Sequence, residues 1–387
     1  MRVLYAAIDQ TVPGTKGGSV HVRAVAEGLA ALGHDVHVLA SPGEQPFPEG
    51  RVRWTAMRPP FAVNQLRWVR AKAIRRIAER LRPDVVIERY YNFAGEGILA
   101  GSAVGAVTVL EVNAPVIDHR GSSKALLDRA FIVEPMRRWR EHLCRRSDLI
   151  VTPSAAILPR GTPGSKVLEL EWGADIERFH QNAGGPLPFK RPPGVVAVFA
   201  GAFRRWHGAI QLARALKLRR AEHQQSISAV FIGDGPELPN VRAEAEGLAD
   251  VVFAGAVEHE RMPACLSAAD IGVAPFDLDA HPPLTLGFYW SPLKIFEYMA
   301  TGLPVVAPRV GRIPALVGHE REGILYNPPS PVALAEALMR LADPQLRQQL
   351  GRAARERAVR EYSWKSHCEA LERAIVGRVK HGRARAL

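Results

Sequence analysis

The stretch SPLKIFEYMATG, Ser291–Gly302, places a lysine and a glutamate one helical turn apart in an otherwise apolar segment. Ser291 suits the capping position of a helix, and Pro292 suits its first turn. Lys294 then lies where the helix dipole disfavours a cation unless an anion binds there. Glu297 follows on the same side of the helix. The spacing predicts either a phosphate clamp beside a hydroxyl-binding carboxylate or a surface lysine–glutamate pair.

Further cations follow another predicted strand. GAFRRWHG, Gly201–Gly208, places Arg204 and Arg205 between the end of a strand and the start of a helix. Two guanidinium groups at such a position can hold a diphosphate through charge-assisted, bidentate hydrogen bonds. The alternative is a pair of solvated loop arginines. FIGDGPE provides a similar glycine turn after the next strand, at Gly233.

A glycine turn also follows the first strand, in GTKGGSVH. Gly17 and Gly18 open a helix there, and free N–H groups at a helix start favour an anion. The spacing is not G-x-G-x-x-G, and Ser41 stands where a nicotinamide-binding domain has an acid. Nicotinamide binding is therefore excluded, and the absence of G-x-x-x-x-G-K-[ST] excludes an ATPase loop. The alternative reading is a turn needed only for strand–helix packing.

The segment FDLDAH carries Asp277 and Asp279 in a spacing that some sugar transferases use to hold a metal ion on a diphosphate. A polar turn is the competing explanation, and it is the one expected here. We expect neither a metal ion nor a resident cofactor.

Composition restricts the class of protein and its compartment. The 387 residues are 47% hydrophobic and 23% charged, as in a globular protein long enough for two domains. The three cysteines lie far apart without metal-binding spacing, which favours a reducing, cytoplasmic location. No apolar run reaches the length of a membrane span, and the N-terminus reads as a strand, not a signal peptide.

Two halves of the chain repeat one rhythm of short β-branched runs and amphipathic helices. This pattern predicts α/β architecture, with two tandem Rossmann-like doubly wound domains facing a cleft. The Pro- and Gly-rich stretch His180–Gly194 marks the linker. We expect an N-terminal domain over 1–180, a donor-binding domain over 181–362, and a helix returning to the first domain over 363–387.

The chain resembles the glycosyltransferases of family 4, which have the GT-B fold. The resemblance covers nearly the whole chain. It is carried by the glycine turn, the opening stretch, LEVNAP, EWGADIERFH, GAFRRWHG, FIGDGPE, FAGAVEHERMPACLSAADIGVAPF and YSWKSHCEALERAI, in this order and spacing. It implies transfer of a sugar from a nucleotide diphosphate donor, with retention at the anomeric carbon.

The resemblance also assigns roles to residues. Glu297 would bind the ribose, Lys294 with Arg204 or Arg205 would neutralise the leaving diphosphate, and Val257 and Glu258 would flank the nucleobase. The expected catalytic residues are Arg204, Lys294, Glu297 and His119. The expected donor-binding residues are Gly17, Gly18, Gly201, Arg205, Gly233, Val257, Glu258, Ser291 and Leu293.

Three positions depart from the family pattern. Tyr289 replaces the first acid of Glu-x7-Glu, and Ala202 replaces the arginine of the common Gly-Arg pair. The histidine that often follows the fifth strand is Asn113, with His119 the nearest replacement. An active transferase acting on a glycan or lipid-linked acceptor is the expectation. A silent nucleotide-sugar-binding subunit and an epimerase of the same fold are the alternatives.

The net charge of +12 has a local origin, because Gln65–Arg82 contains seven basic residues and one acid. At 100° per residue, Trp68 falls beside Lys72 and Arg75, opposite the apolar face. A tryptophan among cations suits the inner surface of an anionic membrane, and a solvated basic helix is the alternative. No nucleic-acid motif is present, so we expect no nucleic-acid partner.

Overall fold

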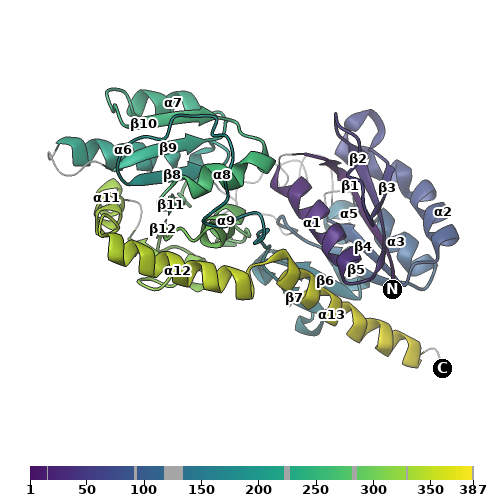
Figure 1. Cartoon of the computed structure of the whole chain (residues 1–387). Helices are drawn as coiled ribbons and strands as arrows, with labels where there is room; N and C mark the ends of the chain where they lie inside the picture. Colours follow the sequence, from purple (N-terminus) through teal and green to yellow (C-terminus); the bar gives the residue numbers. More distant parts are fainter. Residues whose placement is uncertain are drawn as a thin grey trace. The chain divides into compact units, whose positions relative to one another are not determined.

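In the computed structural model, the described residues are 1–14, 16–90, 94–116, 134–221, 227–280, 286–327 and 330–385. The chain divides into two compact units (Figure 1). The first comprises Met1–Trp172, Tyr289–Ser291 and Trp364–Leu387, and the second comprises Gly173–Phe288 and Pro292–Ser363.

The first unit is built on a seven-stranded parallel sheet in the order β3-β2-β1-β4-β5-β6-β7. Its short, β-branched strands are largely buried on both faces, as parallel sheets require. The strands are β1 (Arg2–Val12), β2 (Asp35–Pro42), β3 (Arg53–Ala56), β4 (Val85–Arg89), β5 (Val107–Glu111), β6 (Leu149–Thr152) and β7 (Val167–Glu169).

Helices cover both faces of this sheet, because alternate side chains of each strand point to opposite sides. Val3 and Tyr5 share a core with α1 (Gly17–Ala31) and α13 (Trp364–Arg385). Leu4 packs in a second core that includes Ile74 and Ala100. These last two residues lie on α2 (Ala71–Leu81) and α3 (Glu96–Ala103); α5 (Glu134–Arg146) precedes β6.

The second unit repeats the architecture with six parallel strands in the order β10-β9-β8-β11-β12-β13. Its strands are β8 (Val196–Ala200), β9 (Ser228–Ile232), β10 (Val251–Gly255), β11 (Ile271–Val273), β12 (Val305–Pro308) and β13 (Gly323–Tyr326). Its helices are α6 (Ala209–Ala221), α7 (Leu238–Glu244), α8 (Met262–Ser267), α9 (Leu293–Thr301), α10 (Ile313–Leu316), α11 (Pro331–Arg340) and α12 (Pro344–Glu361). The hydroxyl of Tyr298 on α9 accepts the N–H of Ala200 (2.8 Å), which ties this helix to the central strand.

Both sheets therefore confirm the predicted pair of doubly wound α/β domains. The strand order reverses between β1 and β4 in one sheet and between β8 and β11 in the other. In such sheets ligands bind outside the carboxyl ends of the strands at the point of reversal. The functional groups are therefore sought at these two edges.

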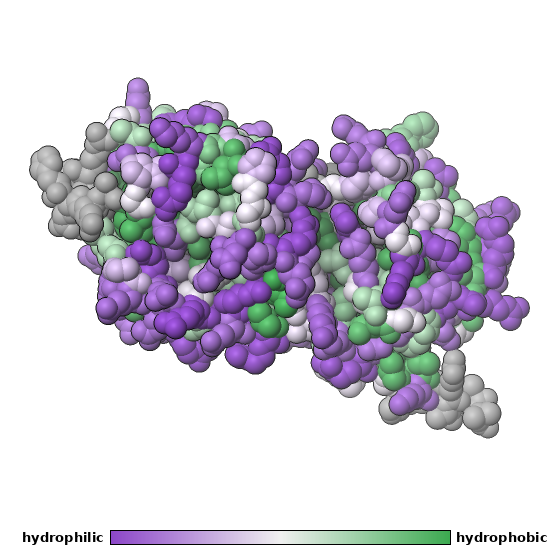
Figure 2. Space-filling model, viewed as in Figure 1, coloured by the Kyte–Doolittle hydropathy of each residue, from purple (hydrophilic) through white to green (hydrophobic). Residues whose placement is uncertain are grey.

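One predicted helix differs from the structure. The segment Gln65–Arg82, which we placed on a single α-helical wheel, lies in a 3-10 helix over Asn64–Arg70 followed by α2. No helix within the described ranges is both long and apolar enough to cross a membrane. The face shown in Figure 2 is mostly hydrophilic, with apolar side chains in scattered patches.

Candidate functional site

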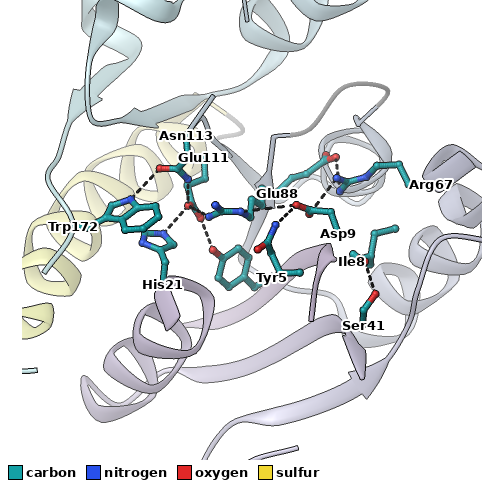
Figure 3. Close-up of polar contacts among 12 residues, drawn as sticks. Tyr5, Ile8, Asp9, His21, Ser41, Arg67, Glu88, Glu111, Asn113 and Trp172 are labelled. Carbon is teal, nitrogen blue, oxygen red and sulfur yellow. Dashed lines mark hydrogen bonds and ion pairs between the residues drawn. The ribbon is translucent and has the colours of Figure 1, made fainter. Parts of the chain in front are cut away.

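Charged side chains gather at the carboxyl edge of the first sheet (Figure 3). Asp9 lies on β1, Glu88 and Arg89 end β4, and Glu111 ends β5. All four side chains are at least nine-tenths buried. Because a buried charge is costly without a partner, their mutual contacts decide whether this edge is stable.

Glu111 is the centre of one part of this cluster. Its carboxylate accepts hydrogen bonds from Arg89 (2.8 Å), the Tyr5 hydroxyl and the Asn113 amide. His21 Nε2 lies 2.6 Å from the same carboxylate. Burial alone would raise the pKa of Glu111, but His21 and Arg89 outweigh it and hold that pKa well below its usual range. Glu111 therefore favours its ionised form, with four partners among the described residues.

Burial disfavours the charged form of two histidines beside this carboxylate. Burial lowers the pKa of His21 despite the nearby carboxylate, and it lowers the pKa of His367 to about 3. The His21 ring packs on Trp172, with centroids 4.5 Å apart. Trp172 in turn donates its indole N–H to the Asn113 oxygen (3.0 Å). Asn113 thus uses its amide to join Glu111 to Trp172.

Arg67 forms the other part of the cluster, and its position corrects the sequence analysis. We counted it among the surface cations, but its side chain is completely buried. It donates to Glu96 (2.5 Å) and Asp9 (3.2 Å) and lies 3.7 Å from Glu88. The reason is the 3-10 segment, which turns this side chain inward where an α-helical wheel does not apply.

Glu88 is held from two sides. It accepts the N–H groups of Gly95 (2.6 Å) and Ile98 (2.7 Å) at the start of α3. Burial and the charge of Glu96 raise its pKa, although Arg67 opposes them. Three carboxyl groups thus share one guanidinium, and Glu88 carries a proton more readily than an ordinary glutamate.

The glycine turn lies beside this cluster. Gly17 is the first residue of α1. A Cβ atom on Gly18 would lie 2.1 Å from the Gln10 side-chain oxygen and 3.3 Å from Arg89 Nη2. Gly18 thus lies in close contact with Gln10 and the cluster, and a larger residue there would require the Gln10 side chain to move. The donor-phosphate role of both glycines stays a prediction.

At the second sheet's edge the central residue is Lys294, on the first turn of α9. Its ammonium is fully buried, 4.2 Å from the Phe199 ring centroid and 5.3 Å from that of Phe276. It has no hydrogen-bond partner within the described part of the chain. Burial lowers its pKa to about 7, although Glu297 opposes this. A buried cation without a partner indicates a place for an anion.

The glycine turns after β8 and β9 leave room for this ammonium. Gly201 has φ of 143°, and a Cβ atom on it would lie 2.9 Å from Lys294 Nζ. Gly233 has φ of 128°, and its Cβ would lie 2.0 Å from the Gly201 carbonyl oxygen. Both positions therefore require glycine, and Gly201 lets the backbone approach Lys294 closely.

Glu297 is buried, so the surface-pair reading of its spacing is wrong. Its carboxylate pairs with His259, whose Nε2 lies 2.8 Å away. This histidine opens a 3-10 helix, His259–Arg261, shortly after β10. Glu297 raises the pKa of His259 and outweighs the lowering by burial. Sequence reasoning missed this residue, although it follows directly on Val257 and Glu258, which we had expected near the nucleobase.

The other residues predicted for the site do not join one network of contacts. Arg204 and Arg205 are exposed on the loop after Gly201, and Glu258 is exposed after β10. Leu293 is the first residue of α9. His119 lies outside the described residues. Tyr289 is buried, with its ring 4.4 Å from that of Trp290.

Ser291 does not cap α9, which corrects another expectation. Its hydroxyl donates to Glu171 (2.8 Å) and accepts the N–H of Trp172 (2.6 Å). Pro292 occupies the capping position, and no side chain caps the helix. Because a helix start without a cap leaves its first N–H groups free, this end of α9 adds donors next to Lys294.

The Asp277–Asp279 segment forms a polar turn. Asp277 accepts the N–H groups of Asp279 (3.2 Å) and Ala280 (3.3 Å). Throughout the described ranges, no three His, Cys, Asp or Glu side chains group closely enough to hold a metal ion.

Comparison with known proteins places this architecture in a family. Residues 15–159 match the family described as Glycosyltransferase Family 4, and residues 194–343 match Glycosyl transferases group 1. The chain is 27% identical to the sulfoquinovosyl transferase SQD2 of Arabidopsis thaliana. The match covers 74% of this chain and 55% of that protein. It is also 27% identical to an MMP alpha-(1->4)-mannosyltransferase of Mycolicibacterium hassiacum, over 90% of this chain and 92% of that protein.

Solved structures agree on the fold. Sucrose-phosphate synthase from Thermosynechococcus elongatus superimposes with a TM-score of 0.72 at 19% identity, covering 100% of both chains. Anabaena Alr3699/HepE in complex with UDP superimposes with a TM-score of 0.69 at 18% identity, covering 97% of this chain and 100% of the other. Two Rossmann-like units of this kind make up the GT-B fold. The chain belongs to glycosyltransferase family 4.

Arg67 is expected to be essential for the stability of the first unit. Arg67→Met leaves Asp9, Glu88 and Glu96 without their shared cation. The free energy of unfolding should fall by about 3–5 kcal/mol, as when one partner of a buried ion pair is removed. Urea denaturation measures this change. Arg76→Met, at an exposed position of α2, is the control and should change stability by less than about 0.5 kcal/mol. Equal effects of the two variants would contradict the role assigned to Arg67.

Lys294 is expected to show the opposite behaviour. Lys294→Met replaces an unpaired buried ammonium with an apolar side chain between two phenyl rings. The free energy of unfolding at pH 7 should rise by about 1–3 kcal/mol, since the desolvation cost disappears. Because the folded pKa lies below the unfolded one, this advantage should shrink as the pH rises from 7 to 10.5. Thermal denaturation at several pH values tests this, with Lys217→Met on the surface of α6 as the control.

Proposed function

We propose that the protein transfers a glycosyl group from a nucleoside diphosphate sugar to a glycan or lipid-linked acceptor, with retention at the anomeric carbon. The observation that carries the proposal is the buried, unpartnered ammonium of Lys294 at the start of α9. It lies one turn from Glu297, in a unit that matches Glycosyl transferases group 1. The described relatives are all glycosyl-transferring enzymes, and HepE structures contain UDP and UDP-glucose.

The donor roles follow from the chemistry of each group. The diphosphate of the donor would supply the negative charge that pairs with the Lys294 ammonium and with the first N–H groups of α9. Arg204 and Arg205, exposed on the loop after Gly201, supply two further cations to it. Glu297 is an acceptor of hydrogen bonds, so it suits the ribose hydroxyls and not the phosphates.

The reaction proposed is a substitution in which the bond between the anomeric carbon and the β-phosphate oxygen breaks. The electron pair stays on the leaving diphosphate, where Lys294 and the arginines stabilise the growing charge. The acceptor oxygen bonds to the anomeric carbon from the same face, and its proton passes to a departing phosphate oxygen. The engagement of Asp9 and Glu111 with Arg67 and Arg89 supports this route, because these carboxylates are already paired.

The acceptor is assigned to the first unit, which also carries an exposed basic and apolar segment. Trp68 is 59% exposed, Val69 is 49% exposed, and Phe61 on the preceding loop is 92% exposed. Lys72 and Arg75 are exposed nearby, whereas Ile74 and Ala78 face the core. With Arg67 removed from the surface, six of the seven basic residues of this segment remain for an anionic membrane. Rings and cations combined in this way suit a lipid headgroup layer.

Nucleotide release is the test of the proposed transfer. Purified protein is incubated with UDP, GDP, ADP and dTDP sugars, with and without an acceptor extract containing glycans and polyprenyl-linked sugars. We expect acceptor-dependent release of one nucleoside diphosphate. Release should persist after exhaustive chelation with EDTA, because the expected phosphate clamp consists of protein cations.

Other outcomes of this experiment identify other functions. Interconversion of the sugar without an acceptor would indicate an epimerase, and binding without release would indicate a silent subunit. Loss of release after chelation that added Mn²⁺ or Mg²⁺ restores would bring Asp277 and Asp279 back as metal ligands. Product anomers resolved by NMR would decide retention.

Membrane association is tested by flotation with vesicles. The wild type should bind vesicles that contain phosphatidylglycerol in 50 mM salt and dissociate in 500 mM salt. Trp68→Ala with Lys72→Glu and Arg75→Glu should reduce the partition coefficient at least about tenfold, since each basic residue contributes roughly 1 kcal/mol. Release of the nucleoside diphosphate from the donor should be unchanged.

Arg352→Glu with Arg360→Glu is the matched control, because it changes the net charge equally on α12 of the second unit. Equal loss of binding in both variants would indicate a nonspecific charge effect. A wild type that ignores anionic vesicles at low salt would remove the membrane from the proposal and favour a dissolved acceptor.

A further inference from the structure

We infer that His259 is a positioning residue for the donor: it holds Glu297 in place for the ribose hydroxyls and keeps this carboxylate away from Lys294. The inference rests on the proposed function. It adds a third side chain, after Lys294 and Glu297, to the carboxyl edge of the second sheet, which we call the donor edge. Neither the sequence motifs nor the glycosyltransferase matches assign a role to this histidine.

The geometry gives Glu297 one main partner. His259 Nε2 lies 2.8 Å from Oε1 of Glu297, and the two side chains are 19% and 9% exposed. The His259 ring lies 5.5 Å from the Phe179 ring, which fixes its orientation on the other side. The backbone carbonyl of Glu297 accepts the Thr301 hydroxyl (2.8 Å), as expected in a regular helix. The carboxylate is therefore held at one oxygen, by one imidazole.

Lys294 would otherwise be the natural partner of this carboxylate. The two residues are three positions apart on α9, a spacing at which opposite charges pair readily. Yet Lys294 Nζ has no hydrogen-bond partner within the described ranges and lies between two phenyl rings. Glu297 bonds to His259 instead. The donor edge thus keeps its anion and its cation apart.

This separation has a chemical consequence for donor recognition. A free ammonium can bind the diphosphate without first breaking an internal ion pair. A carboxylate fixed at one oxygen presents the other to the ribose without losing side-chain entropy on binding. If Glu297 were free to reach Lys294, the protein would lose both the unpaired ammonium and the fixed carboxylate. The charged groups that face His259 are Glu297 from α9, Arg178 from the segment after β7, and Glu260 from its own 3-10 helix.

Two substitutions separate hydrogen bonding from packing. His259→Gln keeps an N–H donor near the position of Nε2 but removes the ring from Phe179. His259→Phe keeps the ring but removes the donor. Both are compared with Glu297→Gln and with the double variant His259→Phe/Glu297→Gln, using the full chain. Calorimetry with UDP, GDP, ADP and dTDP measures binding, and thermal denaturation confirms that each variant is folded.

The expected pattern is specific to positioning. His259→Gln should bind the preferred nucleoside diphosphate within about threefold of the wild type, whereas His259→Phe should bind about tenfold more weakly, the effect of one charged hydrogen bond. In the double variant, His259→Phe should add nothing to the loss caused by Glu297→Gln, because it acts through that carboxylate. In turnover assays the loss should appear in KM for the donor and leave kcat nearly unchanged.

The contrary results are equally distinct. Weaker binding by His259→Gln with normal binding by His259→Phe would show that only ring packing matters. Additive losses in the double variant would show that His259 acts independently of Glu297. Either result overturns the inference while Glu297→Gln still weakens binding, so the proposed function survives. If the wild type binds none of the four nucleotides, the proposed function itself fails, and the inference fails with it.

Discussion

The constraint on which this protein depends is the cost of burying charge at the carboxyl edge of a parallel sheet. Such an edge collects polar side chains from several strands at once, and each ionised group there needs a partner. In the first unit, the partners come from within the protein. Arg89 balances Glu111, and Arg67 reaches from the 3-10 segment to join Asp9 and Glu96. Strand ends far apart in the sequence are thereby fixed to one another.

The second unit meets the same constraint differently. Its edge pairs Glu297 with His259 but leaves the Lys294 ammonium among phenyl rings, where cation–π contacts and the nearby charge of Glu297 stabilise it. Burial lowers the pKa of Lys294 to about 7. A bound phosphate would favour the protonated form. The first edge thus pairs its charged groups with one another, whereas the ammonium of the second edge is the group that we propose to pair with a donor diphosphate.

The fold could be predicted from the sequence because its signal is repetitive. Each strand is a short β-branched run bounded by turn residues, and the structure places a parallel strand at each expected run. The glycines at positions 201 and 233 could also be predicted, since a strand end that approaches another backbone closely allows no Cβ atom. The contacts of side chains that depend on tertiary context could not be predicted from the sequence. Arg67 looks like a surface cation until its 3-10 backbone is known, and the partner of His259 lies 38 positions further along the chain. The roles of His119 and of the exposed arginines remain predictions.

A buried charged residue indicates structure or function according to whether nearby groups offset the cost of its burial. Arg67 breaks the rule that arginine stays at the surface, yet three carboxyl groups compensate for it, so it indicates a structural role. Lys294 breaks two rules, because it is a cation at a helix start and is buried without a hydrogen bond. Within the described part of the second unit, the aromatic rings and the charge of Glu297 offset this cost only in part. A cost that the fold offsets only in part and nevertheless retains is a reason to propose a binding group, and this is why Lys294, and not the more conspicuous cluster around Arg67, supports the proposed donor edge.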